Sequence, residues 1–248
     1  MTRSQRILVI NPIMTSIFDQ FDKDYLQSRA GQLFTIDVES LTHGVETIEE
    51  EYDDALCTPF IVDKVMEAQV KNYDAAIINC FRDPGLGAAR EASDIVVVAP
   101  GEASMLFSMT LGDSFSIIDL GLGKYKRYTP PARVRQLGLS GRFVSERGAE
   151  INVAGISEDI NKTVSEIVSV AKEIQREDEP DVIILGCTGL SQVADSVAQQ
   201  LEIPLVDPSI AALGMTEALL LSGFKRSRRT YPKPAEKQRS VPGSTYLK

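Results

Sequence analysis

The sequence predicts an α/β protein with two pseudo-symmetric lobes, each a mostly parallel sheet flanked by helices. Short runs rich in Ile and Val alternate with helix-like stretches, and the pattern repeats at about half of the chain's length. The chain reads Asp74-Ala-Ala-Ile-Ile-Asn-Cys80 and, 107 positions later, Asp181-Val-Ile-Ile-Leu-Gly-Cys187. Ile7 to Asn11 is matched by Phe115 to Asp119 at an offset of 108. Self-similarity of this kind indicates a duplicated domain.

Seven apolar runs are expected to form strands. They are short and lack clean alternation, which is typical of strands buried on both faces of a parallel sheet. The runs are Ile7–Ile10, Leu33–Val38, Ala75–Ile78, Ile95–Val98, Phe115–Ile118, Val182–Leu185 and Pro204–Val206.

Three later stretches have helical periodicity. Apolar residues recur at three- and four-residue steps between Ser157 and Gln175, and similar patterns run from Leu190 to Leu201 and from Ile210 to Leu221. The last pattern is opened by Asp207-Pro208-Ser209 and closed by Gly223, which are typical start and stop signals of a helix.

The repeat suggests the domain boundaries. We expect residues 1–102 with 210–224 to form the first lobe, residues 103–209 the second, and residues 225–248 a basic, Pro-containing C-terminal tail. Active sites of such sheets lie outside the carboxyl ends of the strands, where Cys80 and Cys187 both fall. The expected active site is therefore the cleft between the lobes.

Charge is distributed unevenly along the chain. The net charge is −9, but the segment from Lys225 onward carries eight basic residues and one acidic residue, so that the remainder is at −16. A body that acidic argues against nucleic acid as a partner. The tail has the composition of a flexible arm, either solvated or lying on an acidic surface of its own or of a neighbouring subunit.

Composition also indicates the cellular compartment in which the protein is expected. No apolar run approaches the ~20 residues of a membrane helix, and the first apolar run is too short for a signal peptide. Three cysteines cannot all pair, and with a single histidine in the chain no zinc-type cluster is expected. We expect a cytoplasmic protein with reduced thiols, no metal and no membrane partner.

The stretch from Gly121 to Gly148 interrupts the alternation of strands and helices. It holds seven basic residues and one acidic residue, with Pro130-Pro131 in its middle. A loop-rich segment of this length is often a lid or a subunit contact, and a basic surface loop is the alternative.

The two matched cysteines suggest proton-transfer chemistry. A thiol with a pKa of ~8.5 is only ~3% thiolate at pH 7, and a helix that begins just after the cysteine raises this fraction. Cys187 precedes a helix-like run, and Pro84 after Cys80 suits the first turn of a helix. One thiolate can remove a proton from a carbon next to a carbonyl while the other thiol protonates the opposite face. This chemistry needs no cofactor; Cys57 has no counterpart in the repeat and is interpreted as structural.

At these residues the chain resembles the aspartate/glutamate/hydantoin racemase superfamily, and within it the hydantoin and allantoin racemase branch. The resemblance extends to about residue 222 and omits the basic tail. The most specific pair of motifs is C-F-x-D-P-G-L together with L-G-C-[AT]-G. The segments that carry it are Ile7-Leu-Val-Ile-Asn-Pro12, Asn79-Cys-Phe-Arg-Asp-Pro-Gly-Leu86, Gly101-Glu-Ala-Ser104, Leu111-Gly-Asp-Ser-Phe-Ser116 and Leu185-Gly-Cys-Thr-Gly-Leu190.

The resemblance implies a cofactor-independent racemase or epimerase that acts on a small molecule and assembles as a homo-oligomer. It assigns Cys80 and Cys187 as the catalytic pair. The substrate pocket it implies contains Asn11, Thr15, Asn79, Phe81, Thr188 and Gly189.

Departures from the motifs bear on the substrate. Gly189 stands where amino-acid racemases of the superfamily often have His or Glu, which favours a cyclic ureide such as a 5-substituted hydantoin or allantoin. The branch commonly reads N-P-N-[TS] after the first strand, whereas this chain reads Asn11-Pro-Ile-Met-Thr15-Ser16. The alternatives are an amino-acid racemase, a decarboxylase or a cis–trans isomerase of the same superfamily, or a two-lobe protein that binds a small molecule without turnover.

Overall fold

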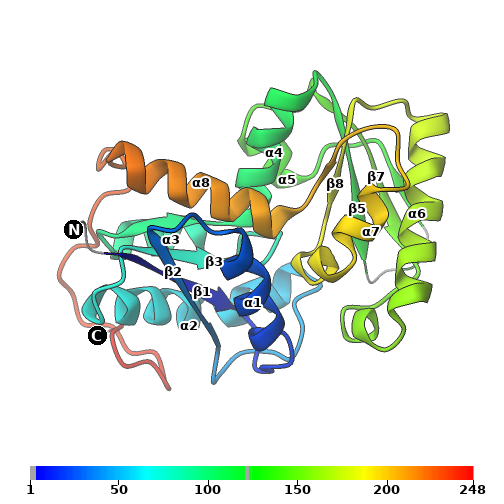
Figure 1. The fold of residues 1–248 in the computed structure, drawn as a ribbon. Coiled ribbons are helices and arrows are strands. Elements are labelled where there is room, and N and C mark those ends of the chain that lie inside the picture. Colours follow the sequence, from blue (N-terminus) through cyan, green and yellow to red (C-terminus); the bar gives the residue numbers. More distant parts are fainter. Residues whose placement is uncertain (1–3, 121–122, 124, 248) are drawn as a thin grey trace. The chain divides into compact units, whose positions relative to one another are not determined.

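Two mainly parallel sheets form the cores of the protein, one in each half of the chain (Figure 1). The structure is a computed structural model that describes residues 4–120, 123 and 125–247. It divides into unit 1, Met1–Ala99 with Ala212–Lys248, and unit 2, Pro100–Ala211. The prediction of an α/β fold with two lobes that repeat one another is confirmed.

The sheet of unit 1 has the strand order β2-β1-β3-β4, and all of its pairings are parallel. The connection from β1 to β2 runs towards one edge of the sheet, and the connection from β2 to β3 runs back towards the other edge. Because both crossovers are right-handed, α1 and α2 lie on opposite faces of the sheet. The four apolar residues Ile7 to Ile10 are at most 1% exposed, as expected of a central strand covered on both faces. The strands are β1 (Gln5–Asn11), β2 (Phe34–Ser40), β3 (Ala75–Ile78) and β4 (Val96–Val98). The helices are α1 (Asp19–Arg29), α2 (Glu51–Val70), α3 (Leu86–Ala92) and α8 (Pro208–Ser222), the last of which begins in unit 2.

The sheet of unit 2 has the order β6-β7-β5-β8-β9, in which β6 alone among the described strands runs antiparallel to its neighbour. The strands are β5 (Phe115–Leu120), β6 (Lys126–Arg127), β7 (Phe143–Ala149), β8 (Val182–Leu185) and β9 (Leu205–Val206). The helices are α4 (Pro100–Leu111), α5 (Ala132–Gln136), α6 (Ile160–Glu177) and α7 (Ala194–Ala198), with the 3₁₀ helices η1 (Ala154–Ser157) and η2 (Thr188–Gln192).

The repeat in the sequence has a physical counterpart at the start of the paired strands. In unit 1 the Oδ2 atom of Asp74 accepts a hydrogen bond from the backbone N–H of Arg6 at 2.8 Å. In unit 2 the Oδ2 atom of Asp181 accepts one from the N–H of Ser114 at 2.9 Å. The acidic residue that opens each of the matching segments therefore fixes the start of the neighbouring central strand.

The structure corrects the expectation for the segment from Gly121 to Gly148. In its described residues this segment forms β6, α5 and β7, and β7 is the counterpart of β2 in unit 1. Ser145, Glu146 and Arg147 lie within β7 and are at most 5% exposed. Because these residues are polar or charged, the strand has no apolar run that the sequence could show.

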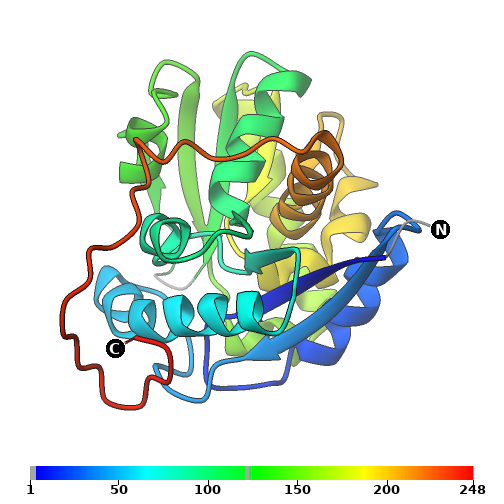
Figure 2. The same ribbon diagram turned by 90° about the vertical axis from the view of Figure 1, so that its left-hand side faces the viewer.

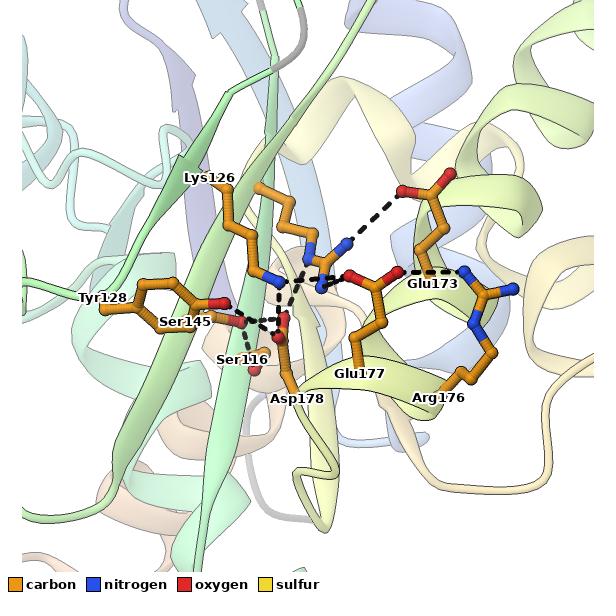
Figure 3. A network of polar contacts seen from close by, with 9 residues as sticks. Ser116, Lys126, Tyr128, Ser145, Glu173, Arg176, Glu177 and Asp178 are labelled. Carbon is orange, nitrogen blue, oxygen red and sulfur yellow. Dashed lines mark hydrogen bonds and ion pairs between the residues drawn. The ribbon is translucent and has the colours of Figure 1, made fainter.

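A network of polar contacts explains how these charges are buried (Figure 3). Arg147 donates to Asp178 at 2.8 Å, to Glu177 at 2.9 Å and to Glu173 at 3.3 Å. The side chain of Asp178 is fully buried and also accepts from Ser145 at 2.7 Å. The network thus joins β7 to the C-terminal end of α6, and its charges compensate one another.

The network lowers the pKa of two carboxyl groups. Burial opposes ionisation of Asp178, but hydrogen bonds from Arg147, Ser145 and Lys126 outweigh it and lower the pKa to about 2. Hydrogen bonds from Arg176, Arg147 and Lys126 lower the pKa of Glu177 to about 2. Both carboxylates therefore stay ionised at acidic pH values at which unperturbed Asp and Glu side chains are largely protonated.

The C-terminal tail makes contacts with unit 1, in line with the second of the two alternatives left open by its composition. Arg226 donates to the carbonyl of Arg90 at 2.8 Å, and Arg228 donates to the carbonyl of Ser93 at 2.6 Å. Further on, the carboxylate of Asp63 in α2 accepts hydrogen bonds from the backbone N–H groups of residues 245–247. The tail therefore runs past α3 and ends beside α2 (Figure 2), on an acidic surface of its own unit.

The helices of the described residues include none that is both long enough and apolar enough to span a lipid bilayer.

Loss of the central cation should destabilise unit 2. The variant Arg147→Met leaves the buried Asp178 without its main partner, and we expect the free energy of unfolding to fall by about 3 kcal/mol. Urea denaturation monitored by circular dichroism measures the change. The matched control Arg176→Met removes an arginine that is 72% exposed, and we expect a change below about 0.5 kcal/mol. Equal losses in the two variants would contradict the role assigned to Arg147.

Acid should weaken unit 2 through the same network. The folded pKa values of Glu177 and Asp178 lie below their unfolded values, so their contribution to stability is present above about pH 5 and is lost as the pH falls towards 2. Urea midpoints measured from pH 7 to pH 3 should fall more steeply for the wild-type protein than for Asp178→Asn, which cannot titrate. Parallel pH profiles for the two proteins would refute this assignment.

Candidate active site

Cys80 lies directly beyond the carboxyl end of β3. The backbone N–H of Asn79 donates to the carbonyl of Ile10 at 2.8 Å, which continues the pairing of β3 with β1 by one residue. The N–H of Cys80 then turns back to the carbonyl of Ile78 at 2.8 Å, and its own carbonyl accepts from Asp83 at 3.0 Å. The half-buried thiol is thus carried by a tight turn at the edge of the sheet where active sites of this fold class lie.

The loop after Cys80 is held in one conformation. Arg82 forms an ion pair with Asp54 of α2 at 2.9 Å. Asp83 is 2% exposed and has a φ of 54°, and Gly85 has a φ of 68°. A Cβ atom on Gly85 would lie 3.1 Å from the side chain of Thr58, so both the backbone angle and the space favour glycine.

One expectation for Cys80 is wrong. The sequence predicts Pro84 in the first turn of a helix just after the cysteine, but α3 begins at Leu86 with Gly85 as its N-cap. The left-handed conformations of Asp83 and Gly85 delay the helix. The helix N-terminus therefore does not follow Cys80 directly in the sequence.

Cys187 occupies the equivalent place beyond β8. The N–H of Gly186 donates to the carbonyl of Ile118 at 2.7 Å, as Asn79 does to Ile10 in unit 1. A Cβ atom on Gly186 would lie 2.7 Å from that carbonyl oxygen, so the close approach of β8 to β5 requires glycine. Cys187 is half-buried and is the N-cap of η2.

Thr188 and Gly189 form the first turn of η2 and are half-buried. The helix expected from Leu190 to Leu201 is in fact divided between η2 and the five-residue helix α7. Structure and sequence therefore agree on the position of the second thiol, but a short 3₁₀ helix follows it in place of a long α-helix.

A buried polar cluster lies at the carboxyl ends of β1 and β3. Asn11 is 3% exposed, and its Nδ2 atom donates to Asp19 at 2.8 Å and to Asp22 at 2.9 Å. The Nδ2 atom of Asn79, which is 5% exposed, donates to Oδ1 of Asn11 at 2.9 Å and to Asp22 at 3.3 Å. The two asparagines that sequence reasoning assigned to the substrate pocket are thus brought together by the buried carboxylate of Asp22.

The other two candidates in unit 1 are half-buried. Ser40 joins Thr15 to this cluster, because its hydroxyl oxygen lies 2.8 Å from the carbonyl of Thr15 and 2.6 Å from Oδ1 of Asp19. Phe81 follows Cys80 in the turn.

Sequence reasoning missed Asp19, Asp22 and Ser40. A signal was available, because Asp19 and Asp22 stand three residues apart in the helix that follows the first strand and so share one helix face. The equivalent of Asn11 in unit 2 is Asp119, which accepts from Tyr125 at 2.9 Å. Burial and the nearby carboxylates of Asp119 and Glu146 raise the pKa of Tyr125, so that it stays a neutral donor.

Cys57 belongs to neither site. It lies in α2, is fully buried and packs against Gly44, where an added Cβ atom would come within 2.9 Å of its sulfur atom. Burial raises the pKa of its thiol. Cys57 is therefore a protonated core residue, in line with its interpretation from the sequence.

The fold, the internal repeat and the positions of the two thiols are shared with a known family of proteins. The model of the family described as "Asp/Glu/Hydantoin racemase" matches residues 7–216, and the chain belongs to this family. It is accordingly an isomerase of the racemase type with a small-molecule substrate.

Curated relatives give the more particular likeness. A hydantoin racemase from Paenarthrobacter aurescens is 33% identical over 235 residues, which cover 94% of this chain and 99% of the relative. A hydantoin racemase from a Pseudomonas species, strain NS671, is 29% identical over 94% of this chain and 93% of its own length.

Solved structures agree with these relatives. The allantoin racemase from Pseudomonas fluorescens has a TM-score of 0.88 and 28% identity, with 96% of this chain and 100% of that chain covered. The allantoin racemase from Klebsiella pneumoniae has a TM-score of 0.87 over 97% and 98% of the two chains, and at 24% identity it supports the fold alone.

Removal of the carboxylate at the centre of the polar cluster should destabilise unit 1. In Asp22→Ala the buried amides of Asn11 and Asn79 lose an acceptor, and we expect the free energy of unfolding to fall by about 2–3 kcal/mol. The matched control is Asp24→Ala on the same helix, where the exposed carboxylate accepts a local bond from Gln20 at 2.9 Å. Thermal and urea denaturation of both variants measure the difference, and a loss for Asp22→Ala no larger than for the control would contradict the role of the cluster.

Proposed function

We propose that this protein is a cofactor-independent racemase of a 5-substituted hydantoin or related cyclic ureide, with Cys80 and Cys187 as its two acid/base groups. The observation that carries the proposal is the equivalent position of the two thiols. Cys80 follows β3, which pairs with β1, and Cys187 follows β8, which pairs with β5. Each cysteine stands one residue after a backbone N–H that binds a carbonyl near the end of β1 or β5. In the proposal both thiols act on the same carbon of the substrate.

The chemistry requires two groups on opposite faces of one carbon. The thiolate of one cysteine removes the proton from the stereogenic carbon, and the electron pair moves into the adjacent carbonyl as an enolate. The thiol of the other cysteine then gives its proton to the opposite face of the same carbon. After one turnover the protonation states of the two sulfur atoms are exchanged, so the enzyme is ready for the opposite enantiomer.

The polar cluster of unit 1 suits a positioning role in this scheme. Both N–H groups of the Asn11 side chain are directed to the carboxylates of Asp19 and Asp22. Asn79, which is bound to the same cluster, immediately precedes Cys80. In the proposal this cluster orients the turn that carries Cys80 and thereby one wall of the pocket.

The substrate class rests on the relatives. The curated proteins that resemble this chain over most of their lengths are hydantoin racemases, and the structure with 28% identity is an allantoin racemase. Hydantoin and allantoin share a five-membered ureide ring in which the reacting C–H lies next to a carbonyl. Gly189, the last residue of the second thiol motif, stands where amino-acid racemases of the superfamily often have His or Glu, which favours such a ring.

The two-thiol mechanism predicts opposite behaviour of two variants. Cys80→Ala and Cys187→Ala should each lower the rate of racemisation by at least ~10²-fold, because each loses the proton transfer on one face. In D2O each variant should still exchange the α-proton of one enantiomer without inversion, and the two variants should act on opposite enantiomers. Chiral chromatography with mass spectrometry, on hydantoins, allantoin and free amino acids, measures both quantities.

The matched control is Cys57→Ala. Its thiol is buried in α2, so the variant should lose some stability and keep a racemisation rate close to that of the wild-type protein. If Cys80→Ala or Cys187→Ala kept a near-wild-type rate, the proposed pair would be wrong. If free amino acids were racemised and cyclic ureides were not, the substrate class would be wrong and the mechanism would stand.

A further inference from the structure

A cavity of about 610 Å³ lies in unit 1, where the C-terminal tail passes the edge of the sheet. Its walls come from the end of α3, from β4, from the last turns of α8 and from the first residues of the tail. Neither Cys80 nor the buried cluster around Asp22 lines it. It is therefore a separate site from the one assigned to catalysis.

The cavity carries positive charge. Among the described residues that line it, the basic side chains are Arg90, Lys225, Arg226 and Arg228, and the acidic side chain is Asp94. The formal charge of the lining is thus +3 in a chain whose net charge is −9. A local excess of this sign on an acidic protein favours an anionic ligand.

Contacts within the protein leave this excess largely in place. The guanidinium group of Arg226 binds the backbone carbonyls of Arg90 and Ile95, and carbonyl groups carry only partial charges. Arg228 reaches Asp94, but the same carboxylate also binds Lys233 at 2.7 Å. One carboxylate is therefore shared between two cations.

The electrostatics of Arg226 reflect this crowding. Burial, followed by repulsion from Arg228 and Arg90, lowers the pKa of Arg226 to about 10. An anion in the cavity would reduce this repulsion. The guanidinium group is also planar and suits oxyanions such as carboxylate and phosphate.

An apolar surface completes the cavity. Phe224 follows α8 and is 73% exposed, an unusual exposure for a large aromatic side chain. Leu219 and Val96 also contribute to the lining. The cavity therefore has both a cationic wall and an apolar wall.

We propose that this cavity binds a small organic anion that carries an apolar group, with its carboxylate or phosphate at the arginines and its apolar group against Phe224. The site is independent of the racemase chemistry, and its test uses binding alone. Carboxylates and phosphate esters share the charge and the planar or tetrahedral oxygens that guanidinium groups recognise, and the experiment separates the two.

The experiment is isothermal titration calorimetry of the full chain at low ionic strength with four probes. Phenyl phosphate and benzoate test the two anion classes, inorganic phosphate tests charge without an apolar group, and benzyl alcohol tests an apolar group without charge. We expect the better of the two aromatic anions to bind at least tenfold more tightly than inorganic phosphate, and benzyl alcohol not to bind measurably. If neither aromatic anion bound with a dissociation constant below about 10 mM, the proposal would be overturned.

Two variants assign the binding to this cavity. Lys225→Gln changes an exposed residue of the cationic wall and should weaken binding about fivefold, whereas Lys237→Gln, a tail residue outside this cavity, should leave binding unchanged. Phe224→Ser should remove the preference for the aromatic anion over inorganic phosphate. Equal effects of the two lysine variants, or an unchanged preference in Phe224→Ser, would overturn the assignment. Circular dichroism confirms that each variant is folded.

Discussion

The position of each thiol depends on one pairing of parallel strands in its unit, β1 with β3 in unit 1 and β5 with β8 in unit 2. In unit 1 this pairing ends with the hydrogen bond from Asn79 to Ile10, and in unit 2 it ends with the bond from Gly186 to Ile118. The next residue is a cysteine in both cases. Because a one-residue shift in register would turn every side chain of a strand to the other face, the buried Ile and Val residues of these strands also fix where the sulfur atoms lie.

The two units bury polar groups at corresponding strands by different means. Unit 1 uses amides and carboxylates at the end of its first strand, where Asn11 and Asp22 meet. Unit 2 places an acid, Asp119, at the matching position and neutral Tyr125 against it, and it buries Arg147 in β7 among carboxylates. Duplication has thus kept the backbone geometry of the repeat, while the side chains that satisfy it have diverged.

Strands whose buried side chains are apolar could be predicted from the sequence, whereas a strand whose buried side chains are polar could not. Apolar runs such as Ala75–Ile78 predict a strand directly. In contrast, β7 contains Ser145, Glu146 and Arg147, and Arg147 is bound by carboxylates from α6 and the residue after it, which the local sequence pattern does not show. Asp22 was missed for the same reason, because the two asparagines that donate to its buried carboxylate come from other elements. The helix expected directly after Cys80 failed for a different reason, because the left-handed conformation of a non-glycine residue, Asp83, has no clear signature in sequence.

The tail also alters how unit 1 meets other chains. As the last strand in its sheet, β4 has an outer edge whose carbonyl groups could template a foreign strand. Arg226 donates a hydrogen bond to the carbonyl of Ile95, and Arg90 donates one to the carbonyl of Val97 at 3.0 Å. A protein that ended before residue 225 would lack Arg226, and the carbonyl of Ile95 would lose this donor. The edge of β4 would then be more open to pairing with a strand of another molecule, and we expect the shortened protein to aggregate more readily at high concentration.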